Sequence, residues 1–113
     1  MNNNLLDEII SMVKRILFEE NDLKHNGNVD VLIDDTNCFR AIIDWERCIG
    51  EIIVDNPDFA PYRFISFNIL ASDSEESKSI YYWIDKDGDS IDYIRAKICE
   101  GLEVADKYSM ILE

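Results

Sequence analysis

The sequence predicts one α+β domain, in which residues 1–113 form an antiparallel sheet of four or five strands with an N-terminal and a C-terminal helix packed on one face. Three observations carry this prediction, of which the first two are that helical periodicity occurs at both ends of the chain and that strand-like alternation occupies most of the residues between them. The third is length, because 113 residues fit one domain that can bury a core without metal or disulfide support.

The two helices are predicted from their apolar spacing. In residues 5–17, apolar side chains recur every three or four positions and polar ones fill the opposite side. The second helix begins near Ile91, with Asp89 or Ser90 as its N-cap, and keeps this spacing almost to the C-terminus. Gly101 lies inside the second helix, at a cost of about 1 kcal/mol relative to alanine. We expect this glycine to let the helix approach the sheet closely.

A hairpin is predicted after the first helix. Val29, Val31 and Ile33 alternate with polar residues, and residues 35–37 then supply turn chemistry before the run at 38–46. The second run has one apolar face, made of Phe39, Ala41, Ile43 and Trp45. Its other face should see water or a partner and carries Arg40, Asp44 and Glu46.

The next run, residues 48–54, has two interpretations. Glu46-Arg47 is poor turn chemistry, so residues 38–54 form either two strands or one long bulged strand. The longest run of strand-forming residues, Tyr62–Ala71, follows the segment that holds both prolines and is the predicted central strand. Its core face consists of Ile65, Phe67 and Ile69, and residues 79–85 form the last strand.

The charge of the chain indicates the kind of partner. A net charge of −13 repels nucleic acid and anionic lipid and attracts basic molecules, so we expect a basic protein partner, no nucleic acid and no membrane. The N-terminal stretch has no basic region before its apolar residues, and the odd count of three cysteines favours reduced thiols. Both features predict a cytoplasmic protein.

No catalytic motif accompanies this scaffold. The single histidine, His25, lies in a polar loop, and the sequence has neither a nucleophile elbow nor a glycine-rich phosphate loop. We therefore expect a protein that is not an enzyme, with no catalytic residue and no cofactor. Residues 85–90 begin like a calcium loop but lack its glycine at position 6 and its final carboxylate, so we predict a strand-to-helix turn and no metal site.

The candidate binding residues are aromatic and acidic. If Ile65 and Phe67 enter the core, Tyr62 and Phe64 point the other way, and we expect the neighbouring strand to add two aromatics to that face. The predicted partner-binding set is Tyr62, Phe64, Tyr81, Trp83, Asp44, Glu46 and Glu51. The alternative is that a second layer covers these aromatics and makes them a second core.

In its size, its acidity and its aromatic and acidic strands, the chain resembles the small acidic immunity proteins of bacterial toxin systems. The most distinctive stretch is WERCIGEIIVDNPDFAPYRFISFNIL, residues 45–70. This resemblance implies tight, stoichiometric binding to a basic toxin domain such as a nuclease, whose active site or a nearby surface is blocked. Two alternatives stand beside it: a small enzyme or ligand-binding domain with a pocket between sheet and helices, and a self-associating accessory subunit. The oligomeric state is left open.

Overall fold

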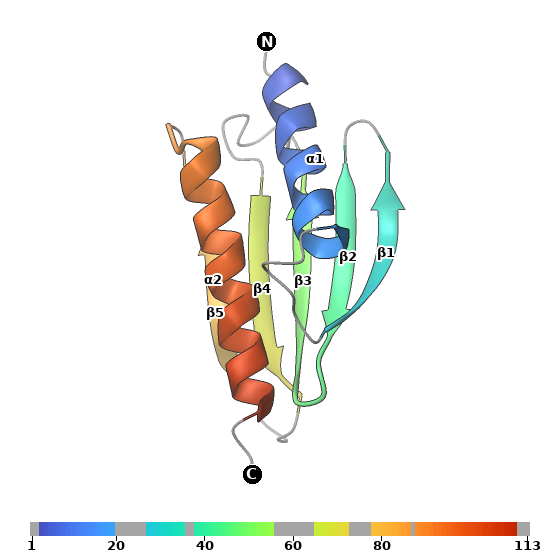
Figure 1. Cartoon of the computed structure of the whole chain (residues 1–113), viewed down its shortest axis with the longest axis vertical. Helices are drawn as coiled ribbons and strands as arrows, with labels where there is room; N and C mark the ends of the chain where they lie inside the picture. The colour runs from blue at the N-terminus through green and yellow to red at the C-terminus, as the bar shows by residue number, and fades with distance from the viewer. Residues whose placement is uncertain are drawn as a thin grey trace.

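The computed structural model describes residues 3–19, 27–35, 38–55, 65–72, 78–86 and 88–110, and it confirms the predicted α+β fold. Five strands form one antiparallel sheet in the order β1-β2-β3-β4-β5, so that strands adjacent in the chain are adjacent in space (Figure 1). The elements are α1 (Asn3–Phe18), β1 (Asn28–Asp34), β2 (Phe39–Asp44), β3 (Cys48–Val54), β4 (Ile65–Ala71), β5 (Ser79–Ile84) and α2 (Ile91–Met110).

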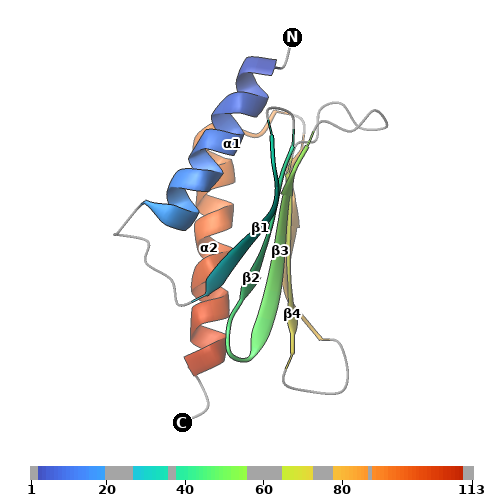
Figure 2. The ribbon, with the colours of Figure 1, turned by 90° about the vertical axis from the view of Figure 1, so that its right-hand side faces the viewer.

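Both helices lie on the same face of the sheet, as predicted, and the molecule has two layers (Figure 2). Apolar side chains of the helices and of the facing strands are buried between the layers, where Ile9, Val13, Phe39, Phe67 and Ile98 are fully buried. Burial of these side chains is the main source of stability of the fold. None of the described helices has the length and apolar character required to cross a bilayer.

The turn between β2 and β3 shows that residues 38–54 form two strands. The backbone N–H of Trp45 donates to the carbonyl of Cys48 at 2.9 Å, and β2 then pairs with β3 from Phe39 opposite Val54 to Asp44 opposite Ile49. The alternative of one long bulged strand is therefore wrong. Trp45 itself is buried on the helix side, as its alternation with Ile43 predicts.

β1 contains an irregularity that the sequence pattern did not reveal. Its pairing with β2 skips Leu32, so that Val31 lies opposite Ala41 but Ile33 lies opposite Arg40. A skipped residue in one strand reverses the faces of all residues after it. The prediction that Ile33 shares a face with Val31 is therefore wrong.

Gly101 provides the close helix approach that the sequence predicted. A Cβ atom at this position would lie 2.6 Å from Cε2 of Phe67 and 2.7 Å from Cε2 of Tyr81. Both distances are shorter than any ordinary van der Waals contact between carbon atoms. The absence of a side chain at Gly101 therefore lets α2 lie directly on the rings of β4 and β5.

The connection from β5 to α2 is a structural turn in its described residues. The carboxylate of Asp85 is buried and accepts a hydrogen bond from the backbone N–H of Ile65 at 2.9 Å. Of the two predicted caps, Ser90 caps α2, because its Oγ accepts from the N–H of Tyr93 at 3.1 Å, whereas Asp89 accepts from the N–H of Lys86 at 2.8 Å. Within the described part of the chain, no group of three metal-ligating side chains occurs.

Candidate binding surface

The sheet face that points away from the helices is the candidate binding surface. No described helix lies on it, and the backbone register determines which side chains it carries (Figure 2). We call this surface the open face. From β1 to β5 it consists of Asn28, Asp30, Ile33, Arg40, Ile42, Asp44, Ile49, Glu51, Ile53, Ser66, Asn68, Leu70, Ser79, Tyr82 and Ile84.

Apolar and polar side chains are interspersed on the open face. Its middle row runs over all five strands through directly opposed residues, namely Asp30, Ile42, Glu51, Asn68 and Tyr82. Tyr82 is 61% exposed and Ile49 is 39% exposed, so large apolar groups are accessible in its middle row and in a neighbouring row. Partly apolar sheet faces bordered by charge are typical of protein-binding surfaces.

An ion pair between β2 and β3 lies near the middle of the open face. Arg40 approaches Oε2 of Glu51 with two nitrogens, Nε at 2.6 Å and a terminal guanidinium nitrogen at 2.5 Å. These side chains are 43% and 31% exposed, so water screens the pair and its contribution to stability is small, below about 1 kcal/mol. Arg40 offsets the charge of Glu51, while Asp44 forms no ion pair with any described residue.

Of the predicted acidic residues, Asp44 and Glu51 lie on the open face, and Asp44 is exposed at its margin. Glu46 is exposed in the turn between β2 and β3, beside the end of the strand that carries Asp44. Asp44 and Glu46 are thus two residues apart at the β2–β3 end of the sheet, and Glu51 lies in the middle row of the open face. Tyr62 and Phe64 lie outside the described residues.

Tyr81 and Trp83 occupy the opposite face from the one predicted. Trp83 lies opposite Phe67 in the β4–β5 pairing, and Tyr81 lies opposite Ile69. Residues directly opposite each other in a sheet share a face, so both aromatics point to the helix layer. The prediction that they flank Tyr62 and Phe64 on the non-core face is therefore wrong.

Contacts with α2 show how the two aromatics are held. The ring of Tyr81 packs edge-to-face on Phe67 at 5.8 Å between centroids, and the ring of Trp83 does the same on Tyr93 at 6.4 Å. The hydroxyl of Tyr81 donates to the carbonyl of Lys97 at 2.6 Å, with the Glu100 carboxylate 3.0 Å away. Burial, followed by the hydrogen bond with Glu100, raises the pKa of Tyr81. Of the alternative stated for these two residues, the covering by a helix is therefore correct, but both pack against the one core between sheet and helices and form no second core.

The sequence analysis did not assign Tyr82, Ile49, Ile53, Leu70 and Ile84 to the binding surface. Tyr82 lies opposite Asn68, which belongs to the same alternation set of β4 as Ser66 and Leu70. The alternation within each strand was visible in the sequence. What could have identified Tyr82 is the pairing register of β4 with β5, and period-two alternation alone does not fix that register.

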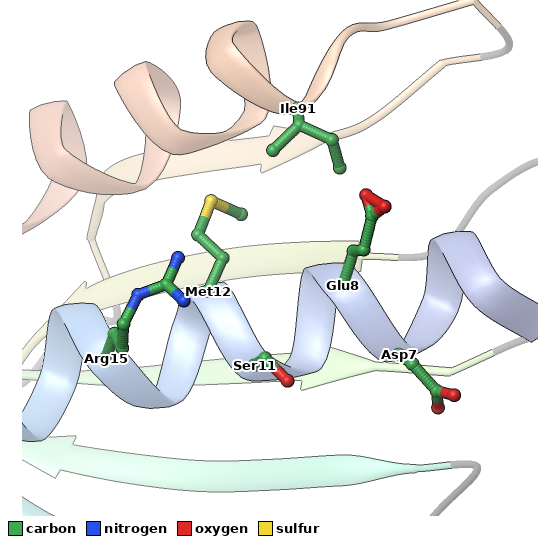
Figure 3. A pocket seen from close by; sticks show the side chains of 6 residues that line it. All are labelled: Asp7, Glu8, Ser11, Met12, Arg15 and Ile91. Carbon is green, nitrogen blue, oxygen red and sulfur yellow. The ribbon is translucent and has the colours of Figure 1, made fainter.

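A shallow hollow of about 300 Å³ lies between the two helices, and it is lined by Asp7, Glu8, Ser11, Met12, Arg15 and Ile91. In Figure 3, Glu8 and Met12 point toward Ile91, whereas Asp7 points away from it. Its lining has carboxylates and a guanidinium but no described cysteine or histidine, and it lies between helices instead of between sheet and helices. This hollow therefore gives no support to the alternative of a ligand pocket between sheet and helices.

Comparison with known proteins assigns no relative to this chain. No protein-family model, no curated protein and no solved structure matches the sequence or the fold described above.

Proposed function

We propose that this protein is a non-enzymatic binding module whose open face docks a basic protein. The observation that carries the proposal is an uncovered sheet face on which accessible apolar groups, above all Tyr82, stand beside acidic side chains. Aromatic residues that become desolvated typically supply most of the affinity of a protein interface, and polar groups at the rim supply specificity.

Charge favours a basic partner over a second copy. The chain carries a net charge of −13, so two copies repel each other while a cationic surface is attracted over the distance of a Debye length. Asp44 and Glu46 contribute to this field at one end of the open face. The same field opposes contact with nucleic-acid phosphates and anionic lipid, which agrees with a protein partner.

Neutralisation of a basic bacterial toxin domain, such as a nuclease, in the cytoplasm is the specific form of this function that we favour. The resemblance to acidic immunity proteins supports it, because such proteins bind their toxin in equal amounts and act without catalysis. The acids and apolar groups interspersed on the open face supply the chemistry that a cationic protein surface would contact.

Capture of the partner from a native lysate of the source cells tests this function. Three tagged proteins are compared: the wild type, the Asp44→Lys/Glu46→Lys variant, and the Glu19→Lys/Glu103→Lys variant as a control. The control acids are exposed and lie at the end of α1 and on α2, so both variants change net charge equally. We expect the wild type and the control each to retain one basic protein, in an amount equal to that of the tagged chain. The Asp44/Glu46 variant should not retain it.

The association rate of the recovered protein gives a second readout. Because opposite charges attract at long range, the rate should fall as salt rises, while dissociation changes less. Retention of a small molecule alone, or of further copies of the chain alone, would contradict the proposal. Equal loss of capture by both variants would show that net charge, and not the open face, determines binding.

A further inference from the structure

β1 forms one edge of the sheet (Figure 1) and carries three consecutive exposed apolar side chains. Val31 is 37% exposed, Leu32 48% and Ile33 37%. Because the pairing with β2 skips Leu32, Val31 faces the helix side and Ile33 faces the open face. An edge strand presents N–H and C=O groups outward, and soluble proteins usually protect such an edge when it is apolar. β1 therefore has the features of a strand that pairs with another chain.

Acidic side chains flank this apolar stretch. Asp30 precedes it, and Asp34 and Asp35 follow it, all of them exposed. Lys14 of α1 lies 2.9 Å from the Asp34 carboxylate and offsets one of the three charges. The edge thus carries acidic side chains on both sides of an apolar centre.

We propose that the β1 edge receives an antiparallel strand from the basic partner, with lysine or arginine near both ends of that strand and apolar residues between them. This inference rests on the proposed function and names where a segment of the partner sits. Cationic side chains opposite Asp30 and Asp34 form favourable cross-strand pairs, and the backbone supplies the remaining hydrogen bonds.

The same geometry disfavours a second copy as the occupant. Antiparallel pairing of two β1 strands would bring together two chains of net charge −13, with Asp30, Asp34 and Asp35 of both copies along the same edge. Repulsion between two acidic edges opposes this pairing. A basic strand removes this repulsion and replaces it with attraction.

The added strand would also continue the binding surface already described. Asp30 and Ile33 belong both to β1 and to the open face, so alternate side chains of the new strand would lie beside them on that face. A partner held at the β1 edge is thereby placed next to the open face. One protein can contact both surfaces.

Two synthetic peptides test the inference in titration calorimetry with the full chain. Both have a centre of alternating valine and threonine; one has lysine near each end and the other has glutamate there. The proteins are the wild type, the Asp30→Lys/Asp34→Lys variant and the Glu19→Lys/Glu103→Lys control, whose change in net charge is the same. Leu32→Lys is a further variant, since a charge in the middle of an edge opposes strand addition.

We expect the lysine peptide to bind the wild type and the control, and to bind the Asp30/Asp34 variant about tenfold more weakly. The glutamate peptide should prefer that variant. Amide hydrogen exchange in β1 should slow when the lysine peptide binds the wild type, and Leu32→Lys should abolish this protection.

Three results would overturn the inference: no binding of the lysine peptide to the wild type, equal weakening by the control variant, or binding without protection of β1. The proposed function is judged separately, by capture with the Asp44→Lys/Glu46→Lys variant. If capture depends on Asp44 and Glu46 but the lysine peptide does not bind, or binds without protecting β1, only the edge-strand inference fails. If capture fails and β1 still binds the lysine peptide with protection, the open-face proposal fails.

Discussion

Trp83 lies directly opposite Phe67 in the antiparallel pairing of β4 and β5. Phe67 is fully buried under the helices. Trp83 shares its face, so the Trp83 ring points to the helix layer and packs on Tyr93 of α2. The residue between the two core-facing aromatics of β5, Tyr82, is consequently turned outward. This one register separates the aromatics that stabilise the fold from the aromatic available to a partner.

Truncation of Trp83 should therefore reduce stability. Trp83→Ala removes a half-buried ring that packs on the core, and we expect a loss of about 2 kcal/mol in the free energy of unfolding, less than for a fully buried tryptophan. Tyr82→Ala, at a more exposed ring, should cost under about 1 kcal/mol. Chemical denaturation measures both, and equal losses in the two variants would contradict the assigned faces.

Gly101→Ala should also destabilise the protein, although alanine is the better helix former. The intrinsic gain of about 1 kcal/mol is outweighed because the new methyl group would overlap the rings of Phe67 and Tyr81. We expect a net loss of about 1–3 kcal/mol. Glu103→Ala, at an exposed position of the same helix, serves as the control and should change stability little. A more stable Gly101→Ala variant would show that α2 is farther from the sheet.

Trp45 connects the β2–β3 turn to the end of α2. Its indole Nε1 donates to the Asp106 carboxylate at 2.7 Å, and neighbouring Arg47 lies over the Tyr108 ring at 5.1 Å. A double-mutant cycle of Trp45→Phe and Asp106→Ala should give a coupling energy of about 1 kcal/mol in thermal or chemical unfolding. Additive losses, with no coupling, would indicate that the hydrogen bond contributes nothing to stability.

Alkaline unfolding should depend on Tyr81. Its folded-state pKa is raised above the ordinary value of 10.0 by burial and by the hydrogen bond with Glu100. A raised pKa means that the folded state keeps the proton longer than the unfolded chain, so this contribution is complete below pH 10 and is lost as pH rises toward the folded-state pKa. Denaturation at several pH values should show a steeper alkaline decline in the wild type than in Tyr81→Phe. Parallel declines would contradict this role.

The arrangement of the elements could be predicted because each has a strong local pattern. The apolar spacing around Ile9 and Ile98 defines the two helices, and the alternation of Phe39, Ala41 and Ile43 defines a half-buried strand. Gly101 was informative as well, since a glycine inside a helical pattern indicates close packing. These signals lie within single elements and need no knowledge of their neighbours.

The binding surface was harder to predict because it depends on relations between strands. The sequence placed Asp44 on the face away from the helices. The face of Trp83 depends instead on the register of β5 with β4, and alternation within β5 fits either of two registers that differ by one residue. The skipped Leu32 in β1 could not be predicted either, because neither Leu32 nor its neighbours are residues that signal a bulge, such as glycine. One-residue shifts of this kind exchange core and surface.

The affinity of the captured basic partner for the Tyr82→Ala variant shows whether the open face is the docking surface, with Tyr93→Ala as the matched control. Both tyrosines are exposed, at 61% and 47%, but Tyr82 lies on the open face and Tyr93 on α2. If the open face is the docking surface, Tyr82→Ala should weaken binding by about 2 kcal/mol, roughly thirtyfold, while Tyr93→Ala leaves the affinity unchanged. Unchanged affinity in Tyr82→Ala, or an equal loss in Tyr93→Ala, would contradict the account.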